Sequence, residues 1–280
     1  MDYSPTVRGR RLMRELTRLR QAQGLSLEVA AQRLDFSKSK LYRVENGRSR
    51  ITLDDLEDML DLYAVRSPQR EALVQLGRDA RKRGWWTAYS DVFTGSYVGL
   101  ESEAARIQVN AHIVPGFLQT EDYARAVIAA TRPTLEHSEV DRRVAARTAR
   151  QKALFGRDVP PEIHVVLDEV ALRRQVGGAE AMSAQLATLA DASTGPHLTL
   201  QVLSFTAGAN AGMEGEFVIL TFPDPEDPPV AYAEGLMGDV YLESEEELDV
   251  YNLAWSHLVD TALSPGESAS MIRKIAKETR

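Results

Sequence analysis

The 280-residue sequence contains no cysteine, which excludes disulfide bridges and thiolate metal sites. No run approaches the ~20 apolar residues that a membrane-spanning helix needs, and the N-terminal segment MDYSPTVRGRR lacks the apolar core of a secretion signal. The five histidines, at positions 112, 137, 164, 197 and 257, have no metal-ligand spacing. We therefore expect a cytoplasmic protein with no membrane contact, no metal and no cofactor.

Motifs of enzymatic chemistry are also missing. There is no GxSxG, no phosphate-binding GxxxxGK and no GxGxxG after a predicted strand. Glycines 208, 212 and 215 come nearest to a phosphate-binding loop, but a mobile hairpin or lid between two strands is the favoured interpretation. We expect no enzymatic activity. An enzyme is therefore the least favoured class of function for this chain.

The charges are distributed unevenly along the chain. Residues 1–84 contain 18 Lys and Arg against 12 Asp and Glu, a net charge of +6, and the remainder contains 15 against 29, a net charge of −14. Since ionic screening acts over about 8–10 Å at cellular salt, each part can attract its own partners. This asymmetry favours a basic nucleic-acid-binding domain joined to an acidic domain, although charge differences between domains are common.

Residues 27–46, LEVAAQRLDFSKSKLYRVEN, predict two short helices joined by a tight turn. Ala30, Ala31 and Leu34 form an apolar stripe on the first helix, and Leu41 and Val44 form one on the second. Ser37 is placed to cap the second helix, whose exposed residues are basic and polar. Such a helix suits insertion into a DNA major groove, while the alternative is an ordinary helical hairpin in a bundle.

This stretch resembles the helix-turn-helix of phage-repressor-like regulators, the XRE family. One departure is Asp35, where the family usually has glycine, in a position that often requires a positive φ; Asp tolerates that conformation better than most residues. Further helices are expected over 8–23, from Thr52, and over 67–83, with Ser67 as N-cap and Pro68 at N1. Residues 1–84 therefore predict an all-α DNA-binding domain of five helices.

The resemblance assigns DNA contacts to basic and polar residues of this domain. Those expected at base edges are Lys38, Ser39, Lys40 and Arg43, and those expected at phosphates are Ser37, Arg20, Arg48 and Arg50. Because one such module has little surface, we expect a homodimer on double-stranded DNA, with half-sites about one helical turn apart.

Adjacent tryptophans, Trp85 and Trp86, follow the basic segment RDARKRG at the start of the larger domain. They form either a ligand or partner surface or, as we favour, the packing between domains. Tyr232 and Tyr241 are further candidates for an apolar ligand pocket, although aromatic residues at such spacings usually belong to a core.

Residues 85–280 resemble the DUF5753-type domain that follows the helix-turn-helix in many actinobacterial XRE regulators. The similarity is carried by GWW, by YVGLESEAARI at 97–107, by VPGFLQTEDYARAVI at 114–128 and by RTARQKALF at 147–155. It implies a regulator of development or secondary metabolism, often encoded beside a small partner protein. We expect this domain to sense a small-molecule effector or a partner protein and to mediate dimerisation; the alternative is an antitoxin-like module that binds a cognate partner and autoregulates its operon.

The fold expected for the whole chain is α+β. Residues 85–157 read as helical, with Leu100, Ala104 and Ile107 on one stripe, and residues 158–280 read as α/β. Capping boxes at Ser244 and Ser264 predict the last two helices. About five strands, at 162–169, 198–205, 216–222, 230–235 and 238–243, predict a mostly antiparallel sheet.

Overall fold

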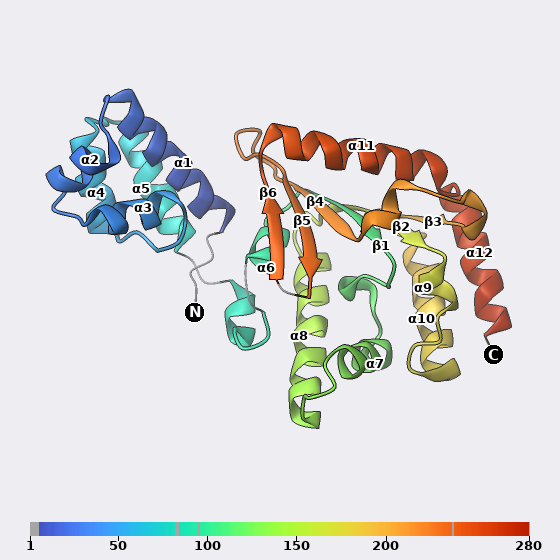
Figure 1. The fold of residues 1–280 in the computed structure, drawn as a ribbon. Helices are drawn as coiled ribbons and strands as arrows, with labels where there is room; N and C mark the ends of the chain where they lie inside the picture. Colours follow the sequence, from blue (N-terminus) through green and yellow to red (C-terminus); the bar gives the residue numbers. More distant parts are fainter. Residues whose placement is uncertain (1–5, 82–83, 94–95, 237, 280) are drawn as a thin grey trace. The chain divides into compact units, whose positions relative to one another are not determined.

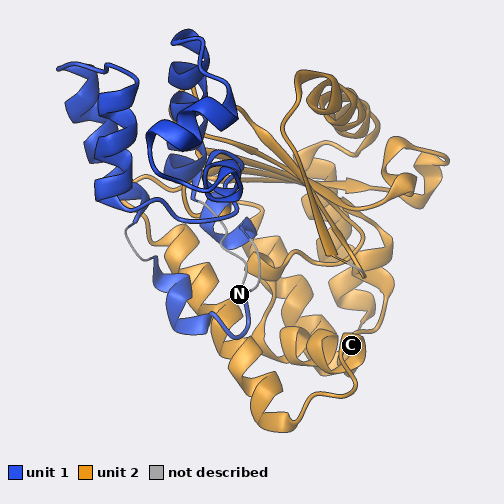
Figure 2. Cartoon of the chain, turned by 60° about the vertical axis from the view of Figure 1, so that its left-hand side comes forward, with its two compact units in different colours: residues 1–100 blue, residues 101–280 orange. Residues whose placement is uncertain are grey.

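A computed structural model describes residues 6–81, 84–93, 96–236 and 238–279. The chain divides into two compact units, Met1–Leu100 and Glu101–Arg280, which Figure 2 shows in different colours. We call them the N-terminal unit and the C-terminal unit. Trp85 and Trp86 belong to the N-terminal unit by this division, while the domain boundary between residues 84 and 85 stays a prediction.

The N-terminal unit is all-helical, as predicted. Its helices are α1 (Val7–Ala22), α2 (Leu27–Arg33), α3 (Lys38–Glu45), α4 (Leu53–Leu62) and α5 (Gln69–Ala80), followed by the short η1 (Trp85–Tyr89) and α6 (Tyr97–Glu101). The start predicted for the fifth helix is wrong: Pro68 is its N-cap residue rather than N1, and no side chain caps it. Lys82 and Arg83, expected at its end, lie outside the described residues.

Side-chain caps determine where the first four helices begin. The side-chain oxygens of Thr6, Ser26, Ser37 and Thr52 each accept a hydrogen bond from the backbone N–H three residues later, which satisfies a donor that has no partner within the helix. The apolar stripes then meet in one core, which includes Leu12, Leu16, Ala31, Leu41, Val44, Leu56 and Leu60. The short helices are therefore stabilised mainly by packing, since helices of seven or eight residues are marginal alone.

Ala64, at the end of α4, has a left-handed backbone with a φ of 54°. Gly24 and Gly47 occupy the equivalent positions after α1 and α3, with φ values of 65° and 63°. Because this conformation costs a residue with a Cβ about 1 kcal/mol, we expect Ala64→Gly to raise the free energy of unfolding by about that amount. Gly24→Ala should lower it similarly, since a Cβ there would meet nothing within 4 Å and only the backbone conformation changes. Urea unfolding of both variants measures the two effects; equal stabilities would contradict this account.

The C-terminal unit contains a mixed sheet of six strands in the order β3-β2-β1-β4-β5-β6. The strands are β1 (Arg106–Ala111), β2 (Glu162–Asp168), β3 (Leu198–Leu203), β4 (Phe217–Thr221), β5 (Val230–Gly235) and β6 (Gly238–Leu242). The prediction of about five mostly antiparallel strands is wrong, because β1, β2 and β3 run parallel while β4, β5 and β6 form an antiparallel meander beside β1.

The missing strand is β1, which the sequence analysis placed in a helical region. Ile107, Val109 and Ala111 face one side of the sheet and alternate with Arg106, Gln108 and Asn110. This spacing of two is the signature of a strand. The helical interpretation grouped Ile107 with Leu100 and Ala104. In the structure, however, Leu100 lies in α6 and Ala104 precedes the strand.

Helices cover both faces of this sheet (Figure 1). In the figure α11 (Glu245–Thr261) runs along one side, and α7 (Glu121–Thr131), α8 (His137–Phe155) and α10 (Gly178–Ala192) lie on the other. The short α9 (Val170–Arg173) precedes α10, and α12 (Pro265–Glu278) ends the chain. The capping boxes predicted at Ser244 and Ser264 are both present. Parallel strands require such crossover helices, which here connect β1 to β2 and β2 to β3.

The glycine-containing segment after β3 links two strands, as predicted, but it is not a hairpin, and its role as a lid stays a prediction. It joins β3 to β4, which are separated in the sheet by β2 and β1. Two 3₁₀ turns, η3 (Phe205–Ala207) and η4 (Ala211–Glu214), form the connection. The buried side chains of Asn110 and Glu169 hold it through hydrogen bonds to Gly215 O and from Phe205 N.

A polar network lies under α11. The Nε2 atom of His164 is 2.7 Å from Oε1 of Gln201, and the Gln201 amide group donates to the carbonyls of Val259 and Leu263. The imidazole also makes an edge contact with the buried Trp255, with ring centroids 5.0 Å apart. Since the Gln201 oxygen can only accept, Nε2 of His164 is the donor, and burial lowers the pKa of the imidazole.

This lowered pKa predicts a pH-dependent stability. The unfolded chain binds the proton at about pH 6.5, whereas the folded chain binds it only at lower pH, so the contribution is present above pH 6.5 and is lost as the pH falls. The loss is about 1.4 kcal/mol for each unit between the two pKa values. We expect urea unfolding at pH 7.5, 6.5 and 5.5 to show a weaker pH dependence in His164→Gln than in the wild type. Identical slopes would exclude His164 as the source.

None of the described helices combines the length and the apolarity needed to cross a membrane.

Candidate nucleic-acid interface

The predicted helix-turn-helix is formed by α2, a four-residue connection and α3. The connection is closed by a hydrogen bond from the Phe36 N–H to the Ala31 carbonyl, 2.9 Å long. Asp35 has a φ of 54°, so the left-handed conformation expected at this position is confirmed. The connection therefore turns the chain without the glycine that is usual there.

One face of α3 is buried and the opposite face is exposed. Leu41 and Val44 are 0% and 1% exposed and pack into the core, as predicted. Lys38, Ser39 and Arg43 lie on the exposed face, and among the described residues the Arg43 guanidinium has no hydrogen-bonding or ionic partner. The structure thus brings three of the four predicted base-reading residues onto one surface, which we call the α3 face.

Tyr42 is a fourth member of the α3 face that the sequence analysis missed. Its side chain is 45% exposed, which is unusual for a large aromatic residue, and the guanidinium carbon of Arg48 lies 5.8 Å from its ring centroid. Residues four apart share a helix face, so the spacing from Lys38 could have identified it. A tyrosine here offers an apolar ring edge for a thymine methyl group and a hydroxyl for a phosphate.

Lys40, in contrast, is turned away from the α3 face. Its ammonium group makes a 2.8 Å ion pair with Asp55 at the start of α4 and lies 3.6 Å above the Phe36 ring. The side chain is 38% exposed. In this arrangement Lys40 ties the turn and α3 to α4, and the base contact predicted for it stays a prediction.

Lys38 forms an exposed ion pair with Glu28 of α2, with side chains 62% and 59% exposed. The hydrogen bond from the Lys38 ammonium holds the pKa of Glu28 below its usual range. Exposed pairs contribute little to stability, so phosphate or base oxygens can displace the carboxylate. Its negative charge, however, repels the DNA backbone.

We therefore expect Glu28→Gln to bind DNA about threefold to tenfold more tightly than the wild type at low salt, with a smaller difference at high salt. Fluorescence anisotropy on one duplex at two ionic strengths measures this. Glu57→Gln, which removes a carboxylate from α4 instead of α2, is the matched control. A weaker complex for Glu28→Gln would show that the carboxylate helps to orient Lys38.

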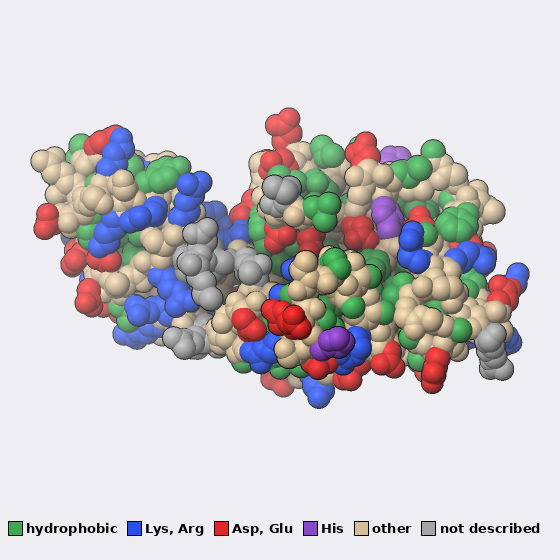
Figure 3. All heavy atoms as spheres, turned by 60° about the horizontal axis from the view of Figure 1, so that its bottom comes forward, with side chains coloured by type: hydrophobic (Ala, Val, Ile, Leu, Met, Phe, Trp, Pro, Cys, Tyr) green, Lys and Arg blue, Asp and Glu red, His purple; other side chains and the backbone are tan. Residues whose placement is uncertain are grey.

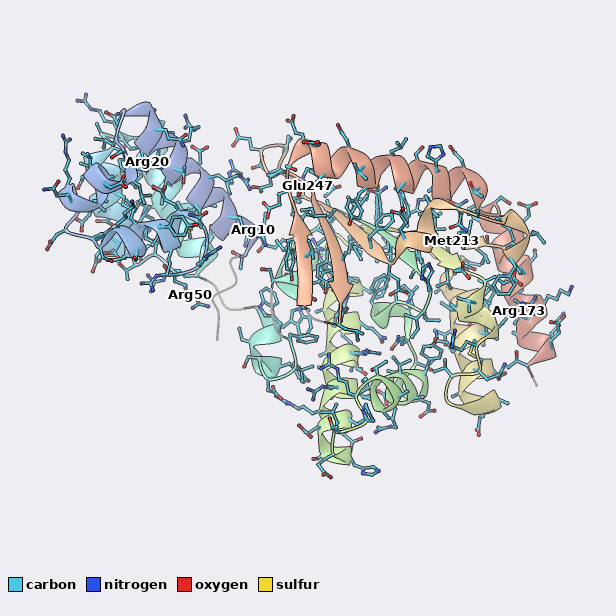
Figure 4. The ribbon with its side chains drawn as sticks, in the orientation of Figure 1. Arg10, Arg20, Arg50, Arg173, Met213 and Glu247 are labelled. Carbon is cyan, nitrogen blue, oxygen red and sulfur yellow. The ribbon has the colours of Figure 1, made fainter. Side chains whose placement is uncertain are left out.

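The residues predicted to contact phosphates differ in their exposure. Arg48 and Arg50 are exposed and lie in the loop after α3, where Figure 4 labels Arg50. Ser37 is exposed and acts as the N-cap, with its hydroxyl oxygen 3.0 Å from the Lys40 N–H. Figure 3 shows several Lys and Arg side chains gathered on the visible face of the N-terminal unit. Ser37, Arg48 and Arg50 are thus all exposed, as a contact with a duplex requires.

Arg20 does not fit the predicted phosphate contact, because its side chain belongs to the interior of the N-terminal unit (Figure 4). Its Nε and Nη2 atoms donate to the two carboxylate oxygens of Glu45, at 2.7 and 2.9 Å, and Nη1 donates to the Leu25 carbonyl. The two side chains are only 10% and 5% exposed. The Glu45 hydrogen bonds raise the pKa of Arg20. Arg20 therefore joins α1 to the end of α3 and is not free to bind DNA.

The two tryptophans belong to an aromatic cluster within the N-terminal unit. Trp85 makes edge contacts with Trp86, Tyr89 and Phe93 at centroid distances of 6.3, 6.4 and 5.6 Å. A Cβ on Gly84 would overlap the Trp86 ring, so the residue before the pair must be glycine. These contacts account for the packing of the two tryptophans within the N-terminal unit. Their role at a domain junction or a ligand surface stays a prediction.

Tyr232 and Tyr241 are cross-strand partners in β5 and β6, with ring centroids 5.2 Å apart. Tyr232 is 7% exposed and contributes to the core of the sheet. Such pairs stabilise neighbouring strands. Among the described residues no group of three or more His, Asp and Glu side chains is placed to hold a metal ion.

Comparison with protein families gives two matches. Residues 94–274 match the model described as a domain of unknown function, DUF5753, and residues 11–73 match that of a helix-turn-helix domain. The first match covers more than half of the chain. Comparison with curated proteins and with solved structures gives no match.

Proposed function

The chain belongs to the DUF5753 family and carries a helix-turn-helix domain, and we propose that it is a sequence-specific regulator of transcription. The helix-turn-helix domain supports DNA binding by itself. The observation that carries sequence-specific reading is the α3 face, where Lys38, Ser39, Tyr42 and Arg43 are exposed while Leu41 and Val44 anchor the same helix to the core. A helix held this way can present side chains to base edges in a major groove.

We further propose that the C-terminal unit senses a small molecule and adjusts DNA binding. It forms its own compact unit with a sheet and a separate set of helices. A ligand can change DNA affinity only through different affinities for two states of the protein. We propose no catalytic step for this protein. We also propose that it acts on the chromosome in the cytoplasm and that it belongs to the XRE family.

Dimerisation is part of this proposal. A single α3 face contacts few base pairs, and related helix-turn-helix proteins bind two half-sites about 34 Å apart as dimers. The C-terminal unit offers an edge for self-association, since β6 pairs with β5 alone among the described strands and Val240 is 50% exposed. Light scattering of the full chain, with and without a two-half-site duplex, measures the oligomeric state.

A second candidate function is an antitoxin-like module that binds a small basic partner and autoregulates its own operon. Its support is the net charge of −14 in residues 85–280 and the three glutamates in the first turn of α11. Purification of the protein from its native host decides between the candidates. A small basic protein that stays bound through high-salt washing favours the second.

Sequence-specific DNA binding is tested in two steps. Genomic fragments that the full-length protein binds are selected, and its affinity for them is then measured at several salt concentrations. We expect a recurring sequence motif, together with a logarithmic salt slope of about −0.9 for each phosphate contact. Equal binding to all fragments would leave only non-specific electrostatic binding and would overturn sequence-specific regulation.

A further inference from the structure

A cavity of about 350 Å³ lies within the C-terminal unit, between α8, α10 and the turn η2 (Gly116–Leu118). Most of its walls are apolar, and these are formed by Phe117, Leu118, Phe155, Ala192, Pro196 and Leu198. Its volume is at the lower end of the range for small-molecule sites in proteins, about 300–1,000 Å³. The cavity can therefore hold a small organic molecule but not a peptide.

The wall formed by η2 is fixed by hydrogen bonds from two helices. The buried Gln185 of α10 accepts from the Thr120 N–H and donates to the Leu118 carbonyl, both at 2.8 Å. Gln151 of α8 donates to the carbonyls of Gly116 and Gln119, at 3.2 and 2.6 Å. These bonds hold the turn in place, so the cavity is preformed and a ligand does not need to order it.

The charge of the lining selects against ions. None of the eleven lining residues is Lys, Arg, Asp or Glu, and the one histidine, His197, is exposed. Transfer of an ion from water to such a site is costly without a partner of opposite charge. The lining therefore favours a neutral ligand.

Apart from the exposed His197, the hydrogen-bonding side chains of the lining leave acceptors but few donors. Both amide hydrogens of Gln151 are used, and their two carbonyl partners fix which atom is nitrogen. The Thr188 hydroxyl donates to the Ala184 carbonyl, and the Gln119 amide group donates to the Val114 carbonyl. Among the described residues no donor reaches Oε1 of Gln151. A ligand that supplies one hydroxyl or N–H group would give Oε1 of Gln151 a hydrogen-bond donor.

Two aromatic rings of the lining determine which shape of ligand fits the cavity. Phe117 is 3% exposed and Phe155 is 39% exposed, and their rings meet edge to face at 6.4 Å. Phe155 thus leaves part of a ring uncovered beside the cavity. An aromatic ligand would extend this edge-to-face arrangement, which is a favoured geometry for aromatic groups.

We propose that this cavity binds a small neutral aromatic molecule carrying one hydrogen-bond donor, such as a phenol, with Oε1 of Gln151 as acceptor. Its role as the effector of DNA binding rests on the proposed function, whereas the binding itself does not.

The test uses the full chain and 4-butylphenol as the probe, with isothermal titration and ligand-observed NMR as readouts. We expect saturable one-site binding. The matched 4-butylanisole, which lacks the donor, should bind about tenfold more weakly, and 4-butylbenzoate, which is anionic, should not bind measurably. No binding of 4-butylphenol, or equal binding of all three probes, would overturn the proposal.

Two variants locate the site. Ala192→Phe fills the cavity and should abolish probe binding, and Phe155→Ala removes an aromatic wall from a partly exposed position and should weaken binding about tenfold. Leu253 of α11 is 62% exposed. Leu253→Phe is therefore the control that should leave probe binding unchanged. Binding that survives both cavity variants, with their unfolding transitions intact, would place the probe elsewhere and overturn the assignment.

DNA affinity measured in parallel separates this inference from the proposed function. Protein that binds specific DNA but not the probe overturns the cavity proposal alone, and protein that binds the probe but no DNA overturns the regulator alone. A change in DNA affinity on adding 4-butylphenol supports the effector role, and an unchanged affinity with the probe bound overturns that role.

Discussion

Replacing Arg20 with alanine is expected to lower the free energy of unfolding of the N-terminal unit by about 3–5 kcal/mol. The substitution leaves the Glu45 carboxylate, whose side chain is 5% exposed, without its bidentate partner. It also removes the donor to the Leu25 carbonyl, at 2.7 Å. Since small domains are stable by only about 5–15 kcal/mol, the substitution would remove a large part of the stability of the N-terminal unit.

The measurement is urea unfolding followed by circular dichroism at pH 7.5. Arg18→Ala is the matched control, because Arg18 lies on the same helix and pairs with Glu15 at 2.8 Å but is 59% exposed. Its loss should change stability by less than about 1 kcal/mol. If Arg20→Ala and Arg18→Ala behave alike, the buried pair does not hold α1 to α3.

A double variant distinguishes the pair from the charge left behind. Arg20→Met with Glu45→Leu removes both charges together and keeps similar volume, so most of the lost stability should return. DNA binding should return with it, because neither side chain belongs to the α3 face. Recovery of stability without DNA binding would show that Glu45 or Arg20 also orients the recognition surface.

Arg20 shows what a sequence-based interpretation of charge misses. The prediction treated it as a surface residue because most arginines are exposed. Its partner is 25 positions away in the chain, at the end of a helix that is otherwise basic. An acidic residue within a cationic recognition helix is the signal that could have indicated a buried pair. The ion pair of Lys40 was missed for the same reason, since its partner Asp55 is in the next helix.

Local signals were more dependable. The cap at Ser37, the helix start at Thr52 and the stripe formed by Leu41 and Val44 depend on near neighbours in the sequence, and the structure has them as predicted. The positive φ of Asp35 is a local property as well. These features sufficed to place the helix-turn-helix and the exposed side of α3.

The sheet depended on long-range pairing and was predicted less well. Residues 106–111 are a strand because β2 and β4 pair on either side of them, from positions 56 to 115 residues later. Short connections after β4 favoured antiparallel pairing correctly for β4, β5 and β6. The helices between β1, β2 and β3 indicate parallel crossovers once β1 is recognised. The cavity beside Phe117 could not have been found without this arrangement.

The largest expected effect on DNA binding comes from changing Lys38 and Arg43 to alanine together. Both are exposed on the α3 face, five positions apart, and neither packs into the core. Each base or charge-assisted contact contributes about 1–3 kcal/mol of discrimination, so the double variant should bind a specific site on the order of 100-fold more weakly or worse. Its residual affinity should approach that for unrelated DNA.

Anisotropy titrations with specific and unrelated duplexes at several salt concentrations measure this. Arg78→Ala with Arg66→Ala removes the same total charge from the same unit outside α2 and α3, so a loss caused only by net charge would appear in both double variants. The unfolding transitions should be unchanged, because the only ion pair lost among the described residues is the exposed one between Lys38 and Glu28. A Lys38 and Arg43 variant that binds its specific site as tightly as the wild type would mean that α3 does not enter the groove, and the exposed side of this helix would need another partner.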